Sequence, residues 1–238
     1  MGTQQVFKCP EGHEMKPMKR VLGDEDPLPA IRRLGRTAAS RFLGRVNAVT
    51  LGWIGAIVPA GSVIVGTKHI EVAPGFFAHG PVWIEALSSY GKQTFSPFIT
   101  IGPDFRASNG VHISAIGQIT IGRDCLFGSG VLITDNSHGA YGVGDEVADH
   151  PLTAPAERRL TTKGEIVIGD CCWLGENVVV LSGVKIGSGT VVSANSVVTR
   201  SLPAHCVAAG SPAQVLKTYD LPTGSWRPGP RGEPGDVQ

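Results

Sequence analysis

Residues 168–203 read IGDCCW LGENVV VLSGVK IGSGTV VSANSV VTRSLP, six hexapeptides in succession with no residue left over. Each opens with a branched aliphatic residue, and the fifth place is small or β-branched in five of the six. A period of six matches neither an α-helix nor a single strand, so it indicates a higher-order repeat. We interpret it as a parallel β-helix in which each hexapeptide supplies one short strand and one turn. Three hexapeptides would close one coil, so residues eighteen apart, such as Ile168 and Ile186, are predicted to lie one above the other.

The composition is that of a globular protein. The chain has 238 residues, of which 42% are hydrophobic and 17% charged, and its formal net charge is +1. This length suffices for one large domain with appendages, and the small net charge offers no basic field for nucleic acid. Five cysteines without framework spacing favour reduced thiols. We therefore predict a cytoplasmic protein, with action at the inner face of the membrane as the alternative.

The sequence divides into three predicted segments: an N-terminal extension (1–45), a β-helix domain (46–217) and a Pro/Gly-rich tail (218–238). From Ala30 to Arg45 apolar residues follow helical spacing among five arginines, which predicts a basic amphipathic helix. This helix either packs on protein, on its own domain or a neighbouring subunit, or associates peripherally with a membrane. Residues 46–66 carry no charge, yet their four glycines and Pro59 favour short strands and turns over a membrane span.

Outside the hexapeptides the repeat is less regular. Residues 63–98 are predicted to form the first, irregular coils, and the phase slips by two residues near Gly117. The register breaks in a loop insertion at residues 136–165, which is a candidate binding region because repeat proteins often place insertions on the binding face. After Pro203, residues 213–219 are predicted to form a short helix that caps the open end of the coils.

A histidine stands where a regular coil gives way to the insertion, in the run Thr134-Asp-Asn-Ser-His138-Gly. An imidazole at such a place can take a proton from an attacking hydroxyl. Asp135 is a candidate to orient that ring. Near the end of the loop, Arg158 and Arg159 either recognise an acidic sugar or phosphate or hold the loop against a neighbouring subunit.

Together, the hexapeptides, DNSHG at 135–139, residues 168–199 and AAGSPAQVLK at 208–217 resemble the hexapeptide-repeat acyltransferases. Within that superfamily they are most similar to bacterial O-acetyltransferases that modify galactosides, maltose and cell-surface polysaccharides. The resemblance covers about residues 63–217. It implies an all-β, left-handed parallel β-helix assembled as a homotrimer, with active sites between subunits. Acetyl-CoA would lie in the groove between neighbouring subunits as co-substrate, and no metal would be required.

The resemblance also implies roles for individual residues. His138 matches the general base that deprotonates the acceptor hydroxyl for direct attack on the thioester, and Trp173 matches a catalytic residue that also lines the cofactor site. Gly175 stands where the backbone approaches the cofactor, and an N–H there would stabilise an oxyanion by about 3 kcal/mol. Gln214 stands where an Arg is common, which weakens the expected phosphate binding. The other matching residues are Ala194, Thr199 and Lys217 for the cofactor and Asn109 and Asn136 for the acceptor.

The function so implied is O-acetylation of a sugar hydroxyl in a cell-surface polysaccharide or its precursor. The alternative on the same fold is N-acetylation of an amino sugar carried on a nucleotide, or acetylation of a xenobiotic such as a streptogramin or chloramphenicol. A zinc carbonic anhydrase would need converging histidines, two of them closely spaced, and His112, His138 and His150 show no such pairing. A purely structural β-helix would need neither a loop histidine nor a Trp-Leu-Gly turn.

Overall fold

The computed structural model describes residues 39, 41–142 and 148–229. Their strands form three main sheets. Sheet C contains β2 (Ile70–Val72), β7 (Phe98–Ile101), β10 (Gln118–Ile121), β15 (Ile166–Ile168) and β18 (Lys185–Ile186). Sheet B contains β1 (Val63–Val65), β4 (Trp83–Ala86), β9 (His112–Ala115), β12 (Leu132–Thr134), β17 (Val179–Val180) and β20 (Val197–Val198). Sheet A contains β3 (Phe77–Ala78), β8 (Arg106–Ala107), β11 (Leu126–Phe127), β16 (Trp173–Leu174), β19 (Val191–Val192), β21 (Cys206–Gly210), β22 (Ala213–Asp220) and β23 (Ser225–Pro228).

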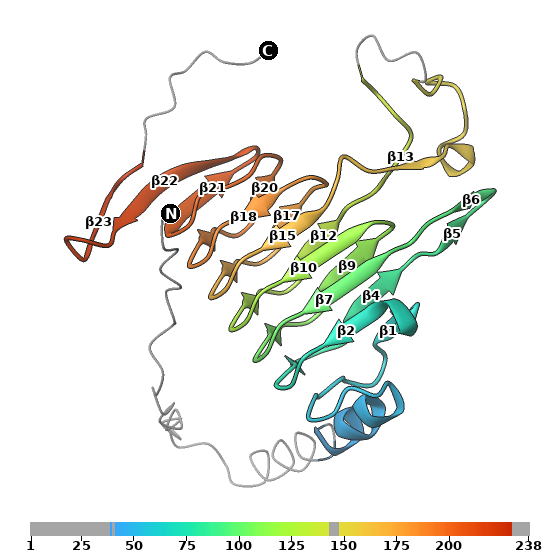
Figure 1. The fold of residues 1–238 in the computed structure, drawn as a ribbon, viewed down its shortest axis with the longest axis horizontal. Coiled ribbons are helices and arrows are strands. Elements are labelled where there is room, and N and C mark those ends of the chain that lie inside the picture. Colours follow the sequence, from blue (N-terminus) through green and yellow to red (C-terminus); the bar gives the residue numbers. More distant parts are fainter. Residues whose placement is uncertain (1–38, 40, 143–147, 230–238) are drawn as a thin grey trace, which may run out of the picture. The chain divides into compact units, whose positions relative to one another are not determined.

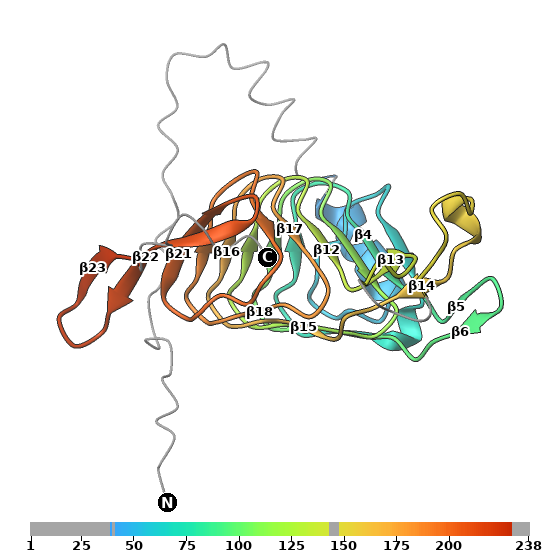
Figure 2. The same cartoon turned by 90° about the horizontal axis from the view of Figure 1, so that it is seen from above.

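Consecutive strands visit the three sheets in rotation, so every three strands close one coil (Figures 1 and 2). Strands β7, β8 and β9 lie in sheets C, A and B, and β10, β11 and β12 repeat that order. Ile168 pairs with Ile186 in parallel register, which confirms the predicted stacking of residues eighteen apart. Arg106 pairs with Leu126, twenty residues later, so the coil that contains Gly117 is longer by the predicted two residues.

Asp135 braces the longer coil. Its side chain is fully buried, and its carboxylate accepts hydrogen bonds of 2.8 Å from the N–H groups of both Ile116 and Gly117. Burial raises the pKa of Asp135, and the two N–H groups act in the opposite direction. The prediction that Asp135 orients the His138 ring is therefore wrong, because the carboxylate is bonded to the corner between β9 and β10.

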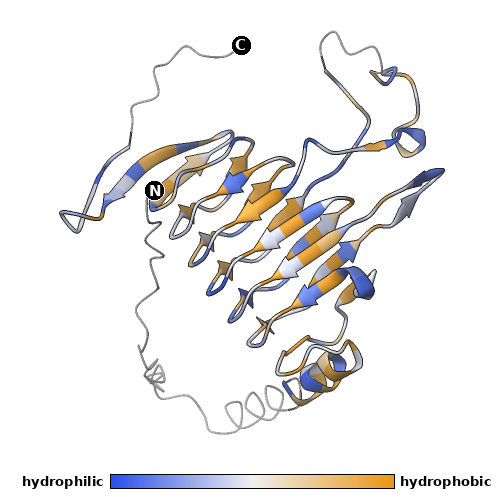
Figure 3. Ribbon diagram, viewed as in Figure 1, coloured by the Kyte–Doolittle hydropathy of each residue, from blue (hydrophilic) through white to orange (hydrophobic). Residues whose placement is uncertain are grey.

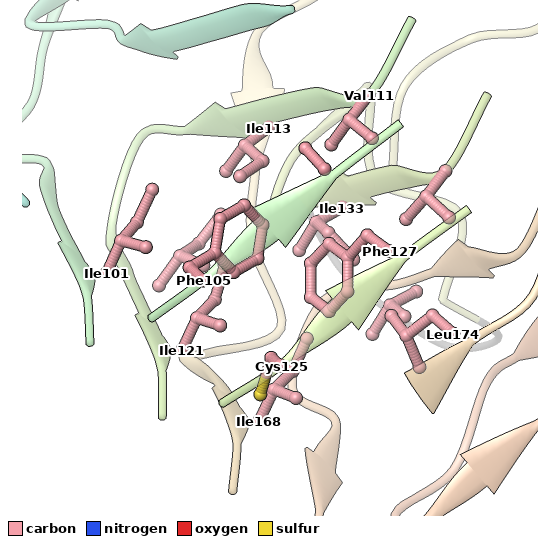
Figure 4. Packing of buried hydrophobic residues seen from close by; sticks show 14 of the residues in the cluster. Ile101, Phe105, Val111, Ile113, Ile121, Cys125, Phe127, Ile133, Ile168 and Leu174 are labelled. Atoms are coloured by element: carbon pink, nitrogen blue, oxygen red, sulfur yellow. The ribbon is translucent and has the colours of Figure 1, made fainter. Parts of the chain in front are cut away.

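The core is a column of aliphatic side chains that point inward from all three sheets (Figure 4). Fully burying one such isoleucine contributes roughly 2–3 kcal/mol to folding. The inward places between sheets C and A are occupied in coil order by Phe76, Phe105, Cys125, Cys172, Thr190 and Cys206, all of them buried. Two of the thiols donate hydrogen bonds to the next coil: Cys125 to the Gly169 carbonyl at 3.2 Å and Cys172 to the Gly187 carbonyl at 3.3 Å. A contact with Cys172, together with burial, raises the pKa of the Cys125 thiol far above its usual range.

A helix at residues 41–50, with residue 39 also helical, packs on the first coil. Gly44 and Ala48 form its buried face, and the Gly44 carbonyl accepts a 3.0 Å hydrogen bond from the Val58 N–H. The predicted helix was placed at 30–45, of which 30–38 lie outside the described residues. The prediction of strands and turns at 46–66 is wrong for 46–50, where the helix continues, and is confirmed for 51–66, where turns lead into β1. No helix among the described residues is long and apolar enough to span a membrane.

The C-terminal end is covered by strands instead of a helix. β22 pairs antiparallel with β21, and β23 pairs antiparallel with β22, so the predicted helix at 213–219 is wrong. This pairing satisfies backbone groups of β21 that would otherwise form an open edge, and Ala213 and Val215 pack against the core. β22 crosses the predicted boundary at residue 218, while residues 230–238 of the predicted tail lie outside the described part.

Two small elements project from the coils on the same side (Figures 1 and 2). One is the hairpin of β5 (Ser89–Tyr90) and β6 (Gln93–Thr94), which follows β4. The other is the insertion, where β13 (Ser137–His138) pairs antiparallel with β14 (Leu160–Thr161). Short 3-10 helices occur at Thr67–His69 (η1) and, within the insertion, Pro155–Glu157 (η2). Both projections are more hydrophilic than the strands of the coils (Figure 3).

We predict that Asp135→Ala lowers the free energy of unfolding by about 3 kcal/mol, because it leaves two N–H groups at a buried corner without an acceptor. Chemical denaturation followed by circular dichroism would measure the change. Glu71→Ala is the matched control, since it removes an exposed carboxylate from β2. Equal destabilisation by both substitutions would contradict the bracing role of Asp135.

Candidate functional site

His138 lies just outside the coils. The chain leaves β12 of sheet B, forms the insertion and returns to β15 of sheet C, so the loop departs at the corner between sheets B and C. The His138 side chain is exposed, and its carbonyl accepts a hydrogen bond from the Tyr141 hydroxyl. Its ring contacts that of Tyr90 edge-on, with centroids 5.2 Å apart. No described residue hydrogen bonds to the His138 ring nitrogens, which leaves both accessible to a substrate.

A cavity of about 510 Å³ lies beside the His138 backbone, between the insertion and the ends of sheet B. The wall on the coils is formed by Thr134, the last residue of β12, and by Leu181 and Thr199, which follow β17 and β20 at equivalent places. Among the described residues that line the cavity, Lys163 alone is charged, and most of the others carry a hydroxyl or an amide. The described lining consists of Thr134, Asn136, Ser137, Gly139, Ala140, Tyr141, Gly142, Thr161, Thr162, Lys163, Leu181, Ser182 and Thr199. Such a lining suits a polar, hydroxyl-bearing ligand.

Arg158 holds the insertion in shape. Its guanidinium donates to the Thr153 carbonyl at 2.9 Å, the Pro151 carbonyl at 2.8 Å and the Tyr141 hydroxyl at 2.7 Å. Arg159 lies 3.6 Å from a carboxylate oxygen of Asp149, within the same loop. Of the two predicted roles, loop holding therefore fits Arg158, although the loop it holds is its own.

The other predicted cofactor residues lie on sheet A or at its corner with sheet B. Leu126, Trp173, Val191, Val207 and Lys217 pair side by side across the outer face of sheet A. Trp173 is 52% exposed there. Asn109, Gly175 and Ala194 occupy the turns that lead from sheet A to sheet B. The predicted site residues on sheet A and in these turns form one group, and Asn136, His138 and Thr199 form another.

A single chain does not bring these two groups together. A coil has three sides, and the corner between sheets B and C is the corner that sheet A does not form. His138 and Thr199 lie at that corner, whereas Trp173 and Lys217 face outward from sheet A. The predicted site residues therefore form two half-sites on different parts of the β-helix.

Packing of neighbouring coils requires glycine at position 175. A Cβ at this position would lie 2.6 Å from the Ala194 nitrogen, so only glycine allows the next coil to stack here. Its N–H donates a 2.8 Å hydrogen bond to the Val192 carbonyl. The predicted oxyanion donor at Gly175 is therefore wrong, because this N–H already bonds to the next coil.

Tyr90 and Gln93 are absent from the predicted site, yet they contact the strand pair β13–β14 that carries His138. Gln93 donates to the Leu160 carbonyl at 3.0 Å and accepts from the Leu160 N–H at 2.8 Å. The run Tyr90-Gly-Lys-Gln93 turns at Gly91, whose φ is 56°, and such a glycine turn is a sequence signal for a hairpin. That signal does not indicate what the hairpin contacts.

Known proteins share the repeat and the site-bearing region. The family described as bacterial transferase hexapeptide (six repeats) matches residues 165–200. The putative lipopolysaccharide biosynthesis O-acetyl transferase WbbJ of Escherichia coli K12 is 42% identical over 140 residues, covering 59% of this chain and 68% of WbbJ. The chain belongs to the hexapeptide-repeat acetyltransferases.

Further comparisons agree with this family. The putative colanic acid biosynthesis acetyltransferase WcaF of E. coli K12 is 35% identical over 127 residues, covering 53% of this chain and 62% of WcaF. The matches thus span about two thirds of the length of these acetyltransferases. AntD, an N-acyltransferase from Bacillus cereus solved with dTDP and coenzyme A, superposes with a TM-score of 0.50 at 15% identity, covering 68% of this chain and 80% of AntD. At that identity the likeness shows the fold alone.

We predict that Gly175→Ala in this acetyltransferase lowers stability first and cofactor binding only as a consequence, because the added Cβ meets the backbone of the next coil. The melting temperature and the affinity for acetyl-CoA should be measured on the same sample. A variant with unchanged melting temperature and reduced affinity would contradict this and favour a direct cofactor contact.

Proposed function

We propose that this chain is an acetyl-CoA-dependent O-acetyltransferase that acetylates a sugar hydroxyl of a cell-surface polysaccharide or of its precursor. The position of His138 carries the proposal: its exposed imidazole lies on a strand pair whose adjacent residues, Ser137 and Gly139, line a cavity rich in hydroxyl and amide groups. Hydroxyl and amide side chains are suited to exchange hydrogen bonds with a sugar. The names of WbbJ and WcaF, which refer to lipopolysaccharide and colanic acid biosynthesis, support a surface glycan as the acceptor class.

In the proposed reaction His138 is the general base. Its neutral imidazole accepts the proton of the acceptor hydroxyl while that oxygen attacks the thioester carbonyl of acetyl-CoA. The tetrahedral intermediate collapses with cleavage of the carbon–sulfur bond, and the imidazolium returns the proton to the departing thiolate. The products are the acetyl ester and coenzyme A. Asn136 and Asn109 are the proposed acceptor contacts, whereas Trp173, Ala194, Thr199 and Lys217 are the proposed cofactor contacts.

We predict that His138→Ala lowers acceptor-dependent release of coenzyme A by about a hundredfold or more, the scale of a lost general base. The assay follows free thiol with acetyl-CoA and a panel of sugars, nucleotide-sugars and lysed-cell glycans. His150→Ala is the matched control, because it removes another exposed histidine of the same insertion. Equal thiol release by wild type and His138→Ala would refute the proposed base, and a preference for amino sugars would favour N-acetylation.

We further infer that the coils wind left-handed and that three chains assemble around a threefold axis, as the resemblance implies. This assembly gives the two half-sites a way to meet: His138 of one subunit would face Trp173 and Ala194 of its neighbour. Such heterologous contacts close into a ring when the rotation between subunits is 120°. The supporting observation is that one chain places the half-sites on different parts of its coil.

A mixing experiment tests the shared site. His138→Ala removes the base, and Ala194→Trp blocks the proposed cofactor groove at an exposed position. Each variant alone should be inactive. Co-expressed mixed trimers should regain activity at about one quarter of the sites, because a site needs one intact half from each of two subunits. Mixed trimers as inactive as the single variants would place both halves of the site within one chain.

A further inference from the structure

The His138 side chain projects from a ribbon that is short and lies outside the coils. β13 contains only Ser137 and His138, and it pairs only with β14. Within this ribbon His138 stands directly opposite Leu160, which is 4% exposed. A two-residue strand pair is too small to be rigid alone. The orientation of the imidazole therefore depends on what packs against the ribbon.

The β5–β6 hairpin supplies that packing. It follows β4, and in sheet B strand β9 lies between β4 and β12, the strand that leads to His138. The hairpin thus reaches past one intervening coil to contact the insertion (Figures 1 and 2). The contact joins residues that are 67 positions apart in the sequence, Gln93 and Leu160.

Gln93 fixes the backbone opposite the base. Its amide donates to the Leu160 carbonyl at 3.0 Å and accepts from the Leu160 N–H at 2.8 Å, so it pairs with Leu160 much as a neighbouring strand would. The two bonds set both the distance and the rotation of β14 relative to the hairpin. Because His138 is the cross-strand partner of Leu160, they also set the backbone that carries the imidazole.

Tyr90 fixes the ring of the base. The two ring planes meet at 77° with centroids 5.2 Å apart, an edge-to-face contact that restricts rotation of the imidazole. The Tyr90 hydroxyl donates a 2.6 Å hydrogen bond to the Ala156 carbonyl in η2. Tyr90 is therefore held at its backbone by the hairpin and at its hydroxyl by the insertion.

We propose that Tyr90 and Gln93 are positioning residues that hold His138 in its catalytic orientation. The proposal rests on the proposed function, since it assigns these residues to the reaction in which His138 is the base. Misplacing a catalytic group by about 1 Å can cost on the order of a hundredfold in rate. Loss of either residue should therefore lower kcat and leave the acetyl-CoA groove, which lies on another part of the β-helix, unchanged.

The kinetic experiment compares Tyr90→Ala, Tyr90→Phe, Gln93→Ala and Lys92→Ala in the full-length protein. Tyr90→Ala and Gln93→Ala should lower kcat by about tenfold to a hundredfold with the KM for acetyl-CoA unchanged. Tyr90→Phe should recover part of the loss, because it keeps the ring contact and removes only the hydroxyl. Lys92→Ala, at the exposed hairpin turn, should match wild type. Wild-type kcat in both Tyr90→Ala and Gln93→Ala would overturn the proposal.

Nuclear magnetic resonance gives a readout that does not need activity. The C–H protons of the His138 ring, assigned by their loss in His138→Gln, should carry a ring-current shift from Tyr90. That shift should disappear in Tyr90→Leu and persist in Lys92→Ala. An unchanged His138 resonance in Tyr90→Leu would overturn the proposal even if that variant were less stable.

The two hypotheses fail separately. Full activity of His138→Ala would refute the role of His138 as the base, and with it the positioning role of Tyr90 and Gln93. If His138→Ala were inactive while Tyr90→Ala and Gln93→Ala were fully active, only the positioning role would be refuted. Melting temperatures of all variants show whether a loss of kcat reflects unfolding of the coils.

Discussion

Each coil depends on the next coil for its backbone hydrogen bonds, and the rest of the structure follows from this dependence. The Gly169 N–H donates to the Ile186 carbonyl at 2.8 Å, and the Gly175 N–H donates to the Val192 carbonyl at 2.8 Å. Close stacking leaves no room for a Cβ at Gly175, so glycine is required at that turn. The first and last coils have a neighbour on one side only. The helix at 41–50 covers the first coil, and β22 pairs with the exposed edge of the last.

The repeat could be predicted from the sequence because it is local, whereas the contacts around His138 could not. The six-residue period predicts the stacking of Ile168 on Ile186, and a break in that period predicts the insertion. The helix predicted at 213–219 is wrong because its spacing is overridden by an open strand edge that exists only in the folded chain. Gln93 could not be predicted as a site residue either, because its contact with Leu160, which is distant in sequence, exists only in the folded chain. Asp135 matches a catalytic pattern by its place beside His138, yet the structure uses it to brace a coil.

A three-sided coil also limits where an active site can form. Side chains on sheet A and side chains at the corner between sheets B and C point away from one another, so no loop movement within one coil brings Trp173 to His138. The proposed site, which contains both of these residues, therefore requires either a second chain or a long insertion. The insertion here folds beside its own corner, where Arg158 ties it to Tyr141, Pro151 and Thr153. In the proposed trimer, a second copy would supply the other half.

The position of His138, the proposed base, outside the coils lowers the rigidity of its backbone. The coils are rigid because the inner strands of each sheet are paired on both sides, but a side chain on a coil faces either the packed core or a flat sheet surface. A strand pair that leaves the corner can hold an imidazole away from the sheet surface, yet it loses the stiffness of the stacked coils. The β5–β6 hairpin restores that stiffness through the Gln93 amide and the Tyr90 ring, both from a coil two places earlier in the same β-helix. Proton transfer needs a base held to within about 0.5 Å, so the rigidity that the repeat supplies elsewhere must here be supplied by side chains.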